Sequence, residues 1–171
     1  MKSISKKYKN IFCSNEQGFS LIEIILGIGM LTMSLVSITS YYRKVLDVSN
    51  ETTRHIQSGF LLEEGLESVK MLRDQSWASK IATLSTTTSY YLYWNGTQWT
   101  ATTTRQIVEN TFTRTFKLAD VKRDGSDNIS SAGTYDAGTK KVTVYVTWSR
   151  KGANNTATDT VETYIANLFN N

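Results

Sequence analysis

A long apolar segment near the N-terminus constrains this chain more than any other feature of its sequence. Residues 19–42 form a run of 24 residues that contains a single charged side chain, Glu23. As an α-helix this run would be about 36 Å long, which is enough to cross a hydrocarbon core of roughly 30 Å with some tilt. Tyr41 and Tyr42 close the run at the position of an interfacial aromatic belt, and Arg43 follows them. The sequence therefore predicts one membrane-spanning helix.

The distribution of charge gives this helix a direction. Four lysines face one acid, Glu16, in residues 1–18, so this short segment accounts for +3 of the net charge of +4. Positive residues favour the cytoplasmic side of a membrane, which places the N-terminus inside. The rest of the chain is nearly neutral. The positive net charge therefore comes mostly from residues 1–18, and we expect no direct binding to nucleic acid.

The segment before the apolar run differs from an ordinary secretory signal. Such a signal has its small-residue cleavage site after the apolar core, whereas here the polar residues 15–18 come before it. A cut after Gly18 would leave the apolar run attached to the mature protein. Gly18 has no Cβ, so a protease can approach its backbone closely. Glu23 costs about 2.5–3.5 kcal/mol at the centre of a membrane and less near an end, so we expect it to have a function and a cationic partner.

The residues Gly18-Phe19-Ser20-Leu21-Ile22-Glu23 resemble the prepilin recognition motif of type IV pilins and of type II secretion pseudopilins. The resemblance implies cleavage between Gly18 and Phe19 by a prepilin peptidase, followed by N-methylation of Phe19. It also implies that the methylated amine pairs with Glu23 of a neighbouring subunit. Such a pair would neutralise both charges and set the axial register. The run 140–148 loosely resembles the C-terminal strands of minor pilins and minor pseudopilins, which favours a minor subunit.

This resemblance implies a set of partners and a location. The partners are the prepilin peptidase, other pilin or pseudopilin subunits, the inner membrane and, indirectly, the assembly platform and its ATPase. The chain would be a single-pass cytoplasmic membrane protein with its head outside, and then part of a cell-surface or periplasmic filament. Adhesion, motility, DNA uptake and secretion stay open as roles of that filament. The alternative function is an uncleaved, membrane-anchored binding module with an extracytoplasmic β-rich head.

The helical pattern continues beyond the membrane segment. Leu62, Leu66 and Val69 follow a spacing of i, i+4 and i+7, with Leu72 close by, and so define one apolar stripe. We expect one helix from about residue 20 to about residue 73, near 80 Å long. Its first half is apolar all round and its second half is amphipathic. Glycines are the positions where this helix could bend: Gly27, Gly29, Gly59 and Gly65.

Beyond Ser76 the apolar period changes to two, which indicates strands. Residues 90–102 read as a hairpin with a type I′ turn at Asn95-Gly96. Two further strands contain alternating core positions, and a last strand is expected at 158–167. The core positions are Phe112, Phe116 and Leu118, with Arg114 on the same side, and then Val142, Val144, Val146 and Trp148.

These elements predict an α+β fold in which a long N-terminal helix packs on a C-terminal antiparallel sheet of four or five strands, as in pilins. The expected domain organisation has three parts. Residues 1–18 are a leader that is removed, and 19–45 are the transmembrane and assembly helix. Residues 46–171 are the globular head, with helix 46–73 and a sheet within 88–168.

The sequence contains few residues that could form a catalytic site. His55 is the only histidine and lies in the helical region, where we expect a solvated side chain rather than part of a Ser-His-Asp or two-histidine site. No phosphate-binding glycine-rich loop is present, and the single cysteine, Cys13, allows no intrachain disulfide. We therefore expect no enzyme activity, no cofactor and no catalytic or metal-ligating residue.

Two further clusters have both a structural and a functional interpretation. The oxygen-rich segment around Asp124, with Asp120 and Asp136 nearby in sequence, could ligate Ca²⁺, but it lacks the closing Glu of an EF-hand and is better explained as a polar turn. A group of aromatic residues either packs across strands or leaves an exposed docking patch, and packing is favoured. The group comprises Tyr90, Tyr91, Tyr93, Trp94 and Trp99. Four tripeptides that match the N-glycosylation pattern, at Asn50, Asn95, Asn128 and Asn154, are expected by chance in a Thr-rich chain.

Overall fold

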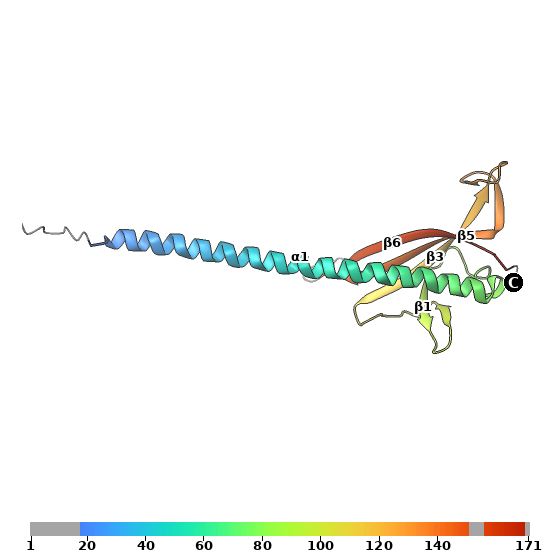
Figure 1. Ribbon diagram of the computed structural model, residues 1–171, viewed down its shortest axis with the longest axis horizontal. Coiled ribbons are helices and arrows are strands. Elements are labelled where there is room, and N and C mark those ends of the chain that lie inside the picture. Colours follow the sequence, from blue (N-terminus) through green and yellow to red (C-terminus); the bar gives the residue numbers. More distant parts are fainter. Residues whose placement is uncertain (1–17, 151–155, 170–171) are drawn as a thin grey trace, which may run out of the picture. The chain divides into compact units, whose positions relative to one another are not determined.

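The computed structural model describes residues 18–150 and 156–169. Apart from Gly18, the expected leader lies outside the described residues, as does the expected turn at 151–155. Figure 1 shows how the helices and strands follow one another along the described chain. They are α1 (Leu21–Gln75), α2 (Trp77–Lys80), β1 (Tyr90–Trp94), β2 (Trp99–Thr102), β3 (Phe112–Arg123), β4 (Ile129–Ser130), β5 (Thr134–Ser149) and β6 (Thr156–Ala166).

Helix α1 confirms the expected single long helix. It contains 55 residues, which corresponds to a length of about 82 Å. The helix begins just after Ser20, whose backbone carbonyl accepts the N–H of Glu23 at 2.9 Å. It ends before Ser76, which takes an extended conformation and whose hydroxyl accepts the N–H of Ser79, so that α2 starts in a new direction. The chain has no proline that would interrupt α1.

The chain divides into two compact units, Met1–Asp47 and Val48–Asn171. In the first unit every described side chain is exposed. In the second unit, α1 buries one stripe against the sheet. The stripe consists of Ser58, Leu62, Gly65, Ser68, Val69 and Leu72. Leu66 was expected on this stripe from its spacing, but it is only half-buried and packs at the margin of the core. Its neighbour Gly65 instead lies on the side of α1 that is close to the sheet.

The six-stranded sheet is antiparallel throughout, with the order β2-β1-β3-β5-β6 and with β4 paired to β3 alone. The α+β fold class is thus confirmed. The sheet exceeds the expected four or five strands because of the two-residue strand β4, which is too short to give an alternating pattern. Strand β6 begins two residues earlier and ends one residue earlier than the expected range of 158–167.

The hairpin of β1 and β2 lies where the sequence predicts it, but its turn is different. Trp94 pairs with Trp99, so the connecting loop has four residues rather than the two of a type I′ turn. The Asn95 side chain explains the difference. Its Oδ1 accepts the backbone N–H groups of Thr97 at 3.0 Å and of Gln98 at 2.9 Å, and so holds the wider loop.

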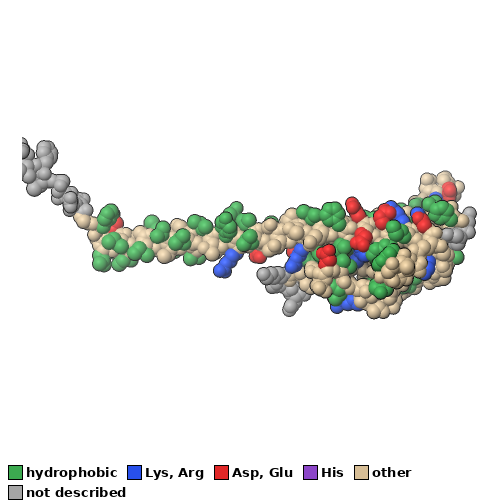
Figure 2. Space-filling view, turned by 60° about the horizontal axis from the view of Figure 1, so that its bottom comes forward, with side chains coloured by type: hydrophobic (Ala, Val, Ile, Leu, Met, Phe, Trp, Pro, Cys, Tyr) green, Lys and Arg blue, Asp and Glu red, His purple; other side chains and the backbone are tan. Residues whose placement is uncertain are grey.

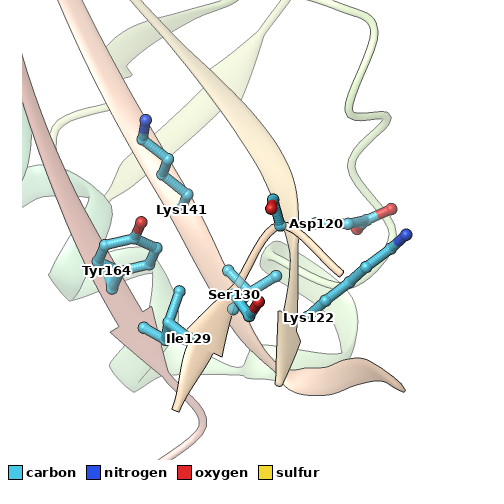
Figure 3. A pocket seen from close by; sticks show the side chains of 8 residues that line it. Asp120, Lys122, Ile129, Ser130, Lys141 and Tyr164 are labelled. Atoms are coloured by element: carbon cyan, nitrogen blue, oxygen red, sulfur yellow. The ribbon is translucent and has the colours of Figure 1, made fainter. Parts of the chain in front are cut away.

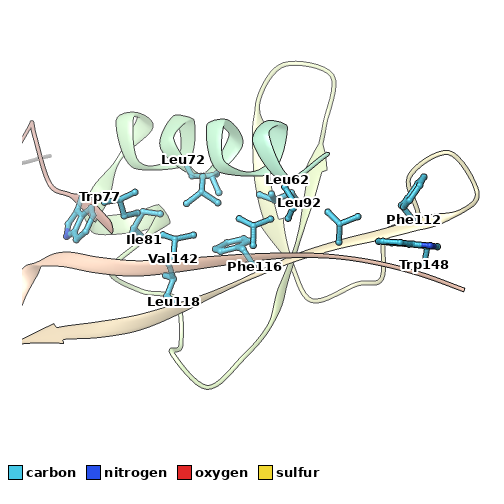
Figure 4. Packing of buried hydrophobic residues seen from close by; sticks show 14 of the residues in the cluster. Leu62, Leu72, Trp77, Ile81, Leu92, Phe112, Phe116, Leu118, Val142 and Trp148 are labelled. Carbon is cyan, nitrogen blue, oxygen red and sulfur yellow. The ribbon is translucent and has the colours of Figure 1, made fainter. Parts of the chain in front are cut away.

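The core lies between the second half of α1 and one face of the sheet. Figure 4 shows Leu62 and Leu72 of the helix above Phe116 and Val142 of the sheet. Trp77 and Ile81 lie at one end of this layer, and Phe112 and Trp148 at the other. The expected alternation is confirmed on β3 and β5. The residues that it places inside are all buried, namely Phe112, Arg114, Phe116, Leu118, Val142, Val144, Val146 and Trp148.

Helix α1 continues without interruption through its four glycines. Gly65 permits close packing. A Cβ at this position would meet Val144 Cγ1 at 2.8 Å and Arg114 Cδ at 3.1 Å, whereas a Cβ at Gly59 would meet no atom within 4 Å. The absence of a side chain at Gly65 therefore lets α1 approach strands β3 and β5 closely.

Candidate functional site

The expected cleavage site lies immediately before α1. Gly18, Phe19 and Ser20 precede the helix, all three are exposed, and Phe19 keeps 79% of its surface accessible. A Cβ at Gly18 would meet no atom within 4 Å. The bond between Gly18 and Phe19 thus lies in non-helical, uncovered chain, which is the form in which a protease can bind a substrate.

Glu23 lies in the first turn of α1, four residues after Phe19. Its carboxylate is exposed, and no salt bridge involves it within residues 18–150 and 156–169. The first turn of a helix carries a partial positive charge, which stabilises an acidic side chain by roughly 0.3–1 kcal/mol in exposed positions. This is less than the cost of an ionised carboxylate within a membrane, so a further cationic partner would be needed there.

The helix between these residues and Asp47 is long and apolar enough to cross a membrane. Figure 2 shows hydrophobic side chains projecting from several sides of its N-terminal part. Its serine and threonine hydroxyl groups are compatible with this environment because each bonds to a carbonyl of the preceding turn, at 2.8–3.0 Å. These residues are Thr32, Ser34, Ser37, Thr39 and Ser40. Satisfied hydroxyls cost little in a membrane, whereas unpaired ones cost several kcal/mol.

His55 is exposed on α1, as expected, but it also belongs to a polar cluster. Its Nδ1 lies 3.0 Å from Asp159 Oδ2 on β6, and its Nε2 lies 3.9 Å from Glu51 Oε1. Ser58 donates its hydroxyl to the same Asp159 oxygen. Serine, histidine and aspartate therefore do meet, which the sequence analysis excluded. The arrangement is not that of a nucleophilic triad. Ser58 is fully buried, and its hydroxyl contacts Asp159 and the backbone carbonyl of His55 rather than the His55 ring.

The same cluster fastens α1 to the end of strand β5. Arg54 donates to the carbonyl of Ser149 at 2.8 Å, and Arg150 donates to Glu51 at 2.9 Å. These contacts join residues more than 90 positions apart in the sequence. These hydrogen bonds and ion pairs hold the helix on the sheet, so the cluster has a structural role.

Among the described residues of the head, Arg114 is the most deeply buried charged side chain, with 3% of its surface exposed. Its Nη1 donates to Glu64 Oε2 at 2.6 Å, and its guanidinium lies 5.1 Å from the centre of the Trp99 ring. The sequence placed Arg114 on the core side but did not identify its partner. An arginine at a core position of a strand could have signalled a carboxylate on the covering helix, since a buried charge is normally paired.

The Asp120–Asp136 region forms salt bridges and a polar turn. Asp120 pairs with Lys140, and Asp136 accepts from Arg123 at 2.7 Å. The hydrogen bond from Arg123 lowers the pKa of Asp136. Asp124 accepts backbone N–H groups of Asn128 and Ser126, which lower its pKa and close the turn. Within the described residues no group of three or more acidic, histidine or cysteine side chains could hold a metal ion.

The register of β3 against β5 shifts between Asp120 and Val121, and a cavity of about 400 Å³ lies beside this irregularity. Figure 3 shows Ile129 and Ser130 of β4 on one side of this cavity and Tyr164 of β6 on another. The lining residues are Asp120, Val121, Lys122, Ile129, Ser130, Ser131, Lys141 and Tyr164. Lys141 is bound to Glu162 at 2.6 Å, so it is not free to attract an anionic ligand.

The aromatic group divides between packing and exposure. Tyr90 and Trp99 pack against the core, whereas Tyr93 and Trp94 keep 46% and 48% of their surface exposed. The expectation of cross-strand packing therefore holds for part of the group, and Trp94 and Trp99 make an edge-to-face contact at 5.6 Å.

No protein-family model, curated protein or solved structure matches this chain.

Proposed function

We propose that this chain is a structural subunit, a minor pilin or pseudopilin, of a type IV pilus-like filament. One observation carries the proposal: the six residues from Gly18 to Glu23 stand at the head of a helix that is apolar and exposed in its first half and packed on a sheet in its second half. The prepilin peptidase cleaves after Gly18 and methylates Phe19. The exposed first half of α1 then provides the surface through which subunits assemble.

Assembly requires that the apolar surface of α1 exchange one apolar environment for another. In the membrane it contacts lipid, and in the filament it contacts the helices of other subunits, so the head remains outside in both states. Before assembly the chain is a single-pass protein of the cytoplasmic membrane. After assembly it belongs to a cell-surface or periplasmic filament. The assembly platform and its ATPase act on it indirectly.

In this proposal Glu23 sets the axial register between neighbouring subunits of the filament. Cleavage creates a positively charged amine at Phe19, which lies four residues from Glu23 on the same helix, so pairing within one subunit is geometrically possible. Pairing between subunits neutralises the same charges and also couples neutralisation to assembly. In an apolar environment a charge that lacks its partner is strongly unfavourable, which would disfavour subunits that enter out of register.

The test is the mass of the mature protein. Intact-mass measurement of the protein from cells that carry the peptidase should give a species that begins at a methylated Phe19. Gly18→Glu should block cleavage and confine the protein to the membrane, because a long charged side chain replaces a hydrogen at the cut. Gln17→Glu adds the same charge one residue earlier and should still be cleaved. A mature wild-type protein that begins at Met1 would refute the proposal and favour an uncleaved, membrane-anchored binding module.

A further inference from the structure

A second cavity, of about 370 Å³, lies between the last turns of α1 and the β1–β2 hairpin. Its volume falls within the range of small-molecule sites in proteins. Its lining combines apolar and polar side chains that come from two elements of the head. They are Met71, Asp74 and Gln75 of α1, and Trp94, Thr97, Gln98 and Trp99 of the hairpin.

Two tryptophans, Trp94 and Trp99, form one wall of this cavity, and Arg114 contacts the ring of Trp99. The Arg114 guanidinium lies 5.1 Å from the centre of the Trp99 ring, and Arg114 is itself fixed by Glu64. Trp99 in turn contacts Trp94 edge to face, with an angle of 63° between the rings. Trp94 nevertheless keeps 48% of its surface exposed. A large aromatic ring that is oriented by its neighbour and open to solvent is suited to stack on a ligand.

The polar part of the wall indicates what kind of ligand this is. No lysine or arginine is among the lining residues, so an anionic ligand would find no direct counter-charge. The one acidic group, Asp74, forms a salt bridge with Arg73 at 2.7 Å, which weakens its attraction for a cationic ligand. Gln75 and Gln98 carry amides that both donate and accept hydrogen bonds, and Thr97, whose hydroxyl donates to Asn95 Oδ1 at 2.9 Å, can accept one. This set matches a neutral ligand with several hydroxyl groups.

We propose that this cavity binds a neutral saccharide. A pyranose ring has one face of C–H groups, which carry a slight positive charge and suit the negative face of an indole ring. Its hydroxyl groups lie at the rim, where amide side chains can donate to them and accept from them. In this arrangement one sugar ring stacks on Trp94, while Gln75 and Gln98 bond to its hydroxyls. The inference does not rest on the filament function, because the cavity lies within the head.

The test uses the full-length protein, unassembled, in a polyoxyethylene detergent, because a glycoside detergent would compete for the site. Chitotetraose and cellotetraose serve as probes, and tryptophan fluorescence and calorimetry follow their binding. At least one of them should bind saturably. Trp94→Ala should weaken that binding about tenfold or more, through the loss of the stacked ring. Gln75→Ala should weaken it by a smaller factor.

Tyr93→Ala is the matched control. Tyr93 precedes Trp94 on the same strand and is about equally exposed, but successive side chains of a strand point to opposite faces. Its removal should leave saccharide binding unchanged, and circular dichroism should show that all variants are folded. The proposal is overturned if neither tetrasaccharide binds up to about 10 mM, or if Trp94→Ala has no more effect than Tyr93→Ala. It is equally overturned if a proline-rich decapeptide binds at Trp94 in place of the sugars.

Discussion

Replacement of Gly65 by alanine tests how closely α1 packs on the sheet. Two opposing effects are expected. Alanine is favoured over glycine inside a helix by about 1 kcal/mol. The new Cβ, however, would lie 2.8 Å from Val144 Cγ1 and 3.1 Å from Arg114 Cδ. Carbon atoms prefer separations of about 3.5–4.0 Å, so side chains or the helix must move, and overpacking of this kind costs about 1–3 kcal/mol. Gly65→Ala should therefore destabilise the head by about 0–2 kcal/mol.

Gly59→Ala, six residues earlier on the same helix, provides the matched control. A Cβ at Gly59 would meet no atom within 4 Å, so only the gain in helix propensity remains. Gly59→Ala should stabilise the head by up to about 1 kcal/mol. Because this gain is common to both variants, the difference between them isolates the packing effect, which should be about 1–3 kcal/mol.

The assay is urea unfolding of the full-length protein in detergent, followed by tryptophan fluorescence, since Trp77 and Trp148 are buried in the core. A third comparison sharpens the result. Val144→Ala removes the methyl group that a Cβ at Gly65 would meet, so Gly65→Ala should cost less in that background, with a coupling energy of about 0.5–3 kcal/mol. Equal stabilisation by Gly59→Ala and Gly65→Ala would refute the close approach of α1 to the sheet.

Three further predictions follow from the fold and the proposed function. Glu23→Gln should be cleaved normally, because the change lies beyond the scissile bond, yet it should be depleted from sheared filament fractions; equal incorporation would show that Glu23 does not set the register. Leu72→Ala should cost about 2–5 kcal/mol in urea unfolding, since Leu72 is fully buried, and half-buried Leu66→Ala should cost less; the reverse order would contradict the observed stripe. Arg123 lowers the pKa of Asp136, so this carboxylate stabilises the head above the unfolded aspartate pKa of about 3.9 and its contribution is lost as the pH falls through the lower native pKa. Asp136→Asn should therefore reduce the loss of stability between neutral and acidic pH, and an unchanged pH profile would refute this contribution.

Local patterns explain why much of the fold could be predicted. The long helix with its apolar first half and the alternation on β3 and β5 depend only on the order of residues along the chain, which determines the face on which each side chain lies. For the same reason Phe112, Phe116 and Leu118 were expected on one face, and they are buried together. The resemblance of the residues from Gly18 to Glu23 to a prepilin recognition motif likewise depends on six consecutive residues.

The turn of the hairpin shows where local reasoning gave an incomplete answer. Asn95-Gly96 is the usual signal for a two-residue turn, and the hairpin does form there. The Asn95 side chain, however, bonds to two backbone N–H groups and holds a four-residue loop, while the Trp94–Trp99 pair sets the register. A side chain that competes for backbone hydrogen bonds can thus change a turn without changing the strands.

The sequence alone determined the apolar helix, its single charge at Glu23 and the face of the sheet that becomes the core. Only the tertiary structure decided which residues meet across that core. Arg114 finds Glu64 fifty positions away, and His55 finds Asp159 at a separation of 104. Gly65 acquires its role from Val144 in the same way. Such pairs depend on the position at which the helix lies on the sheet, and this position results from the packing of the whole core rather than from any spacing along the chain.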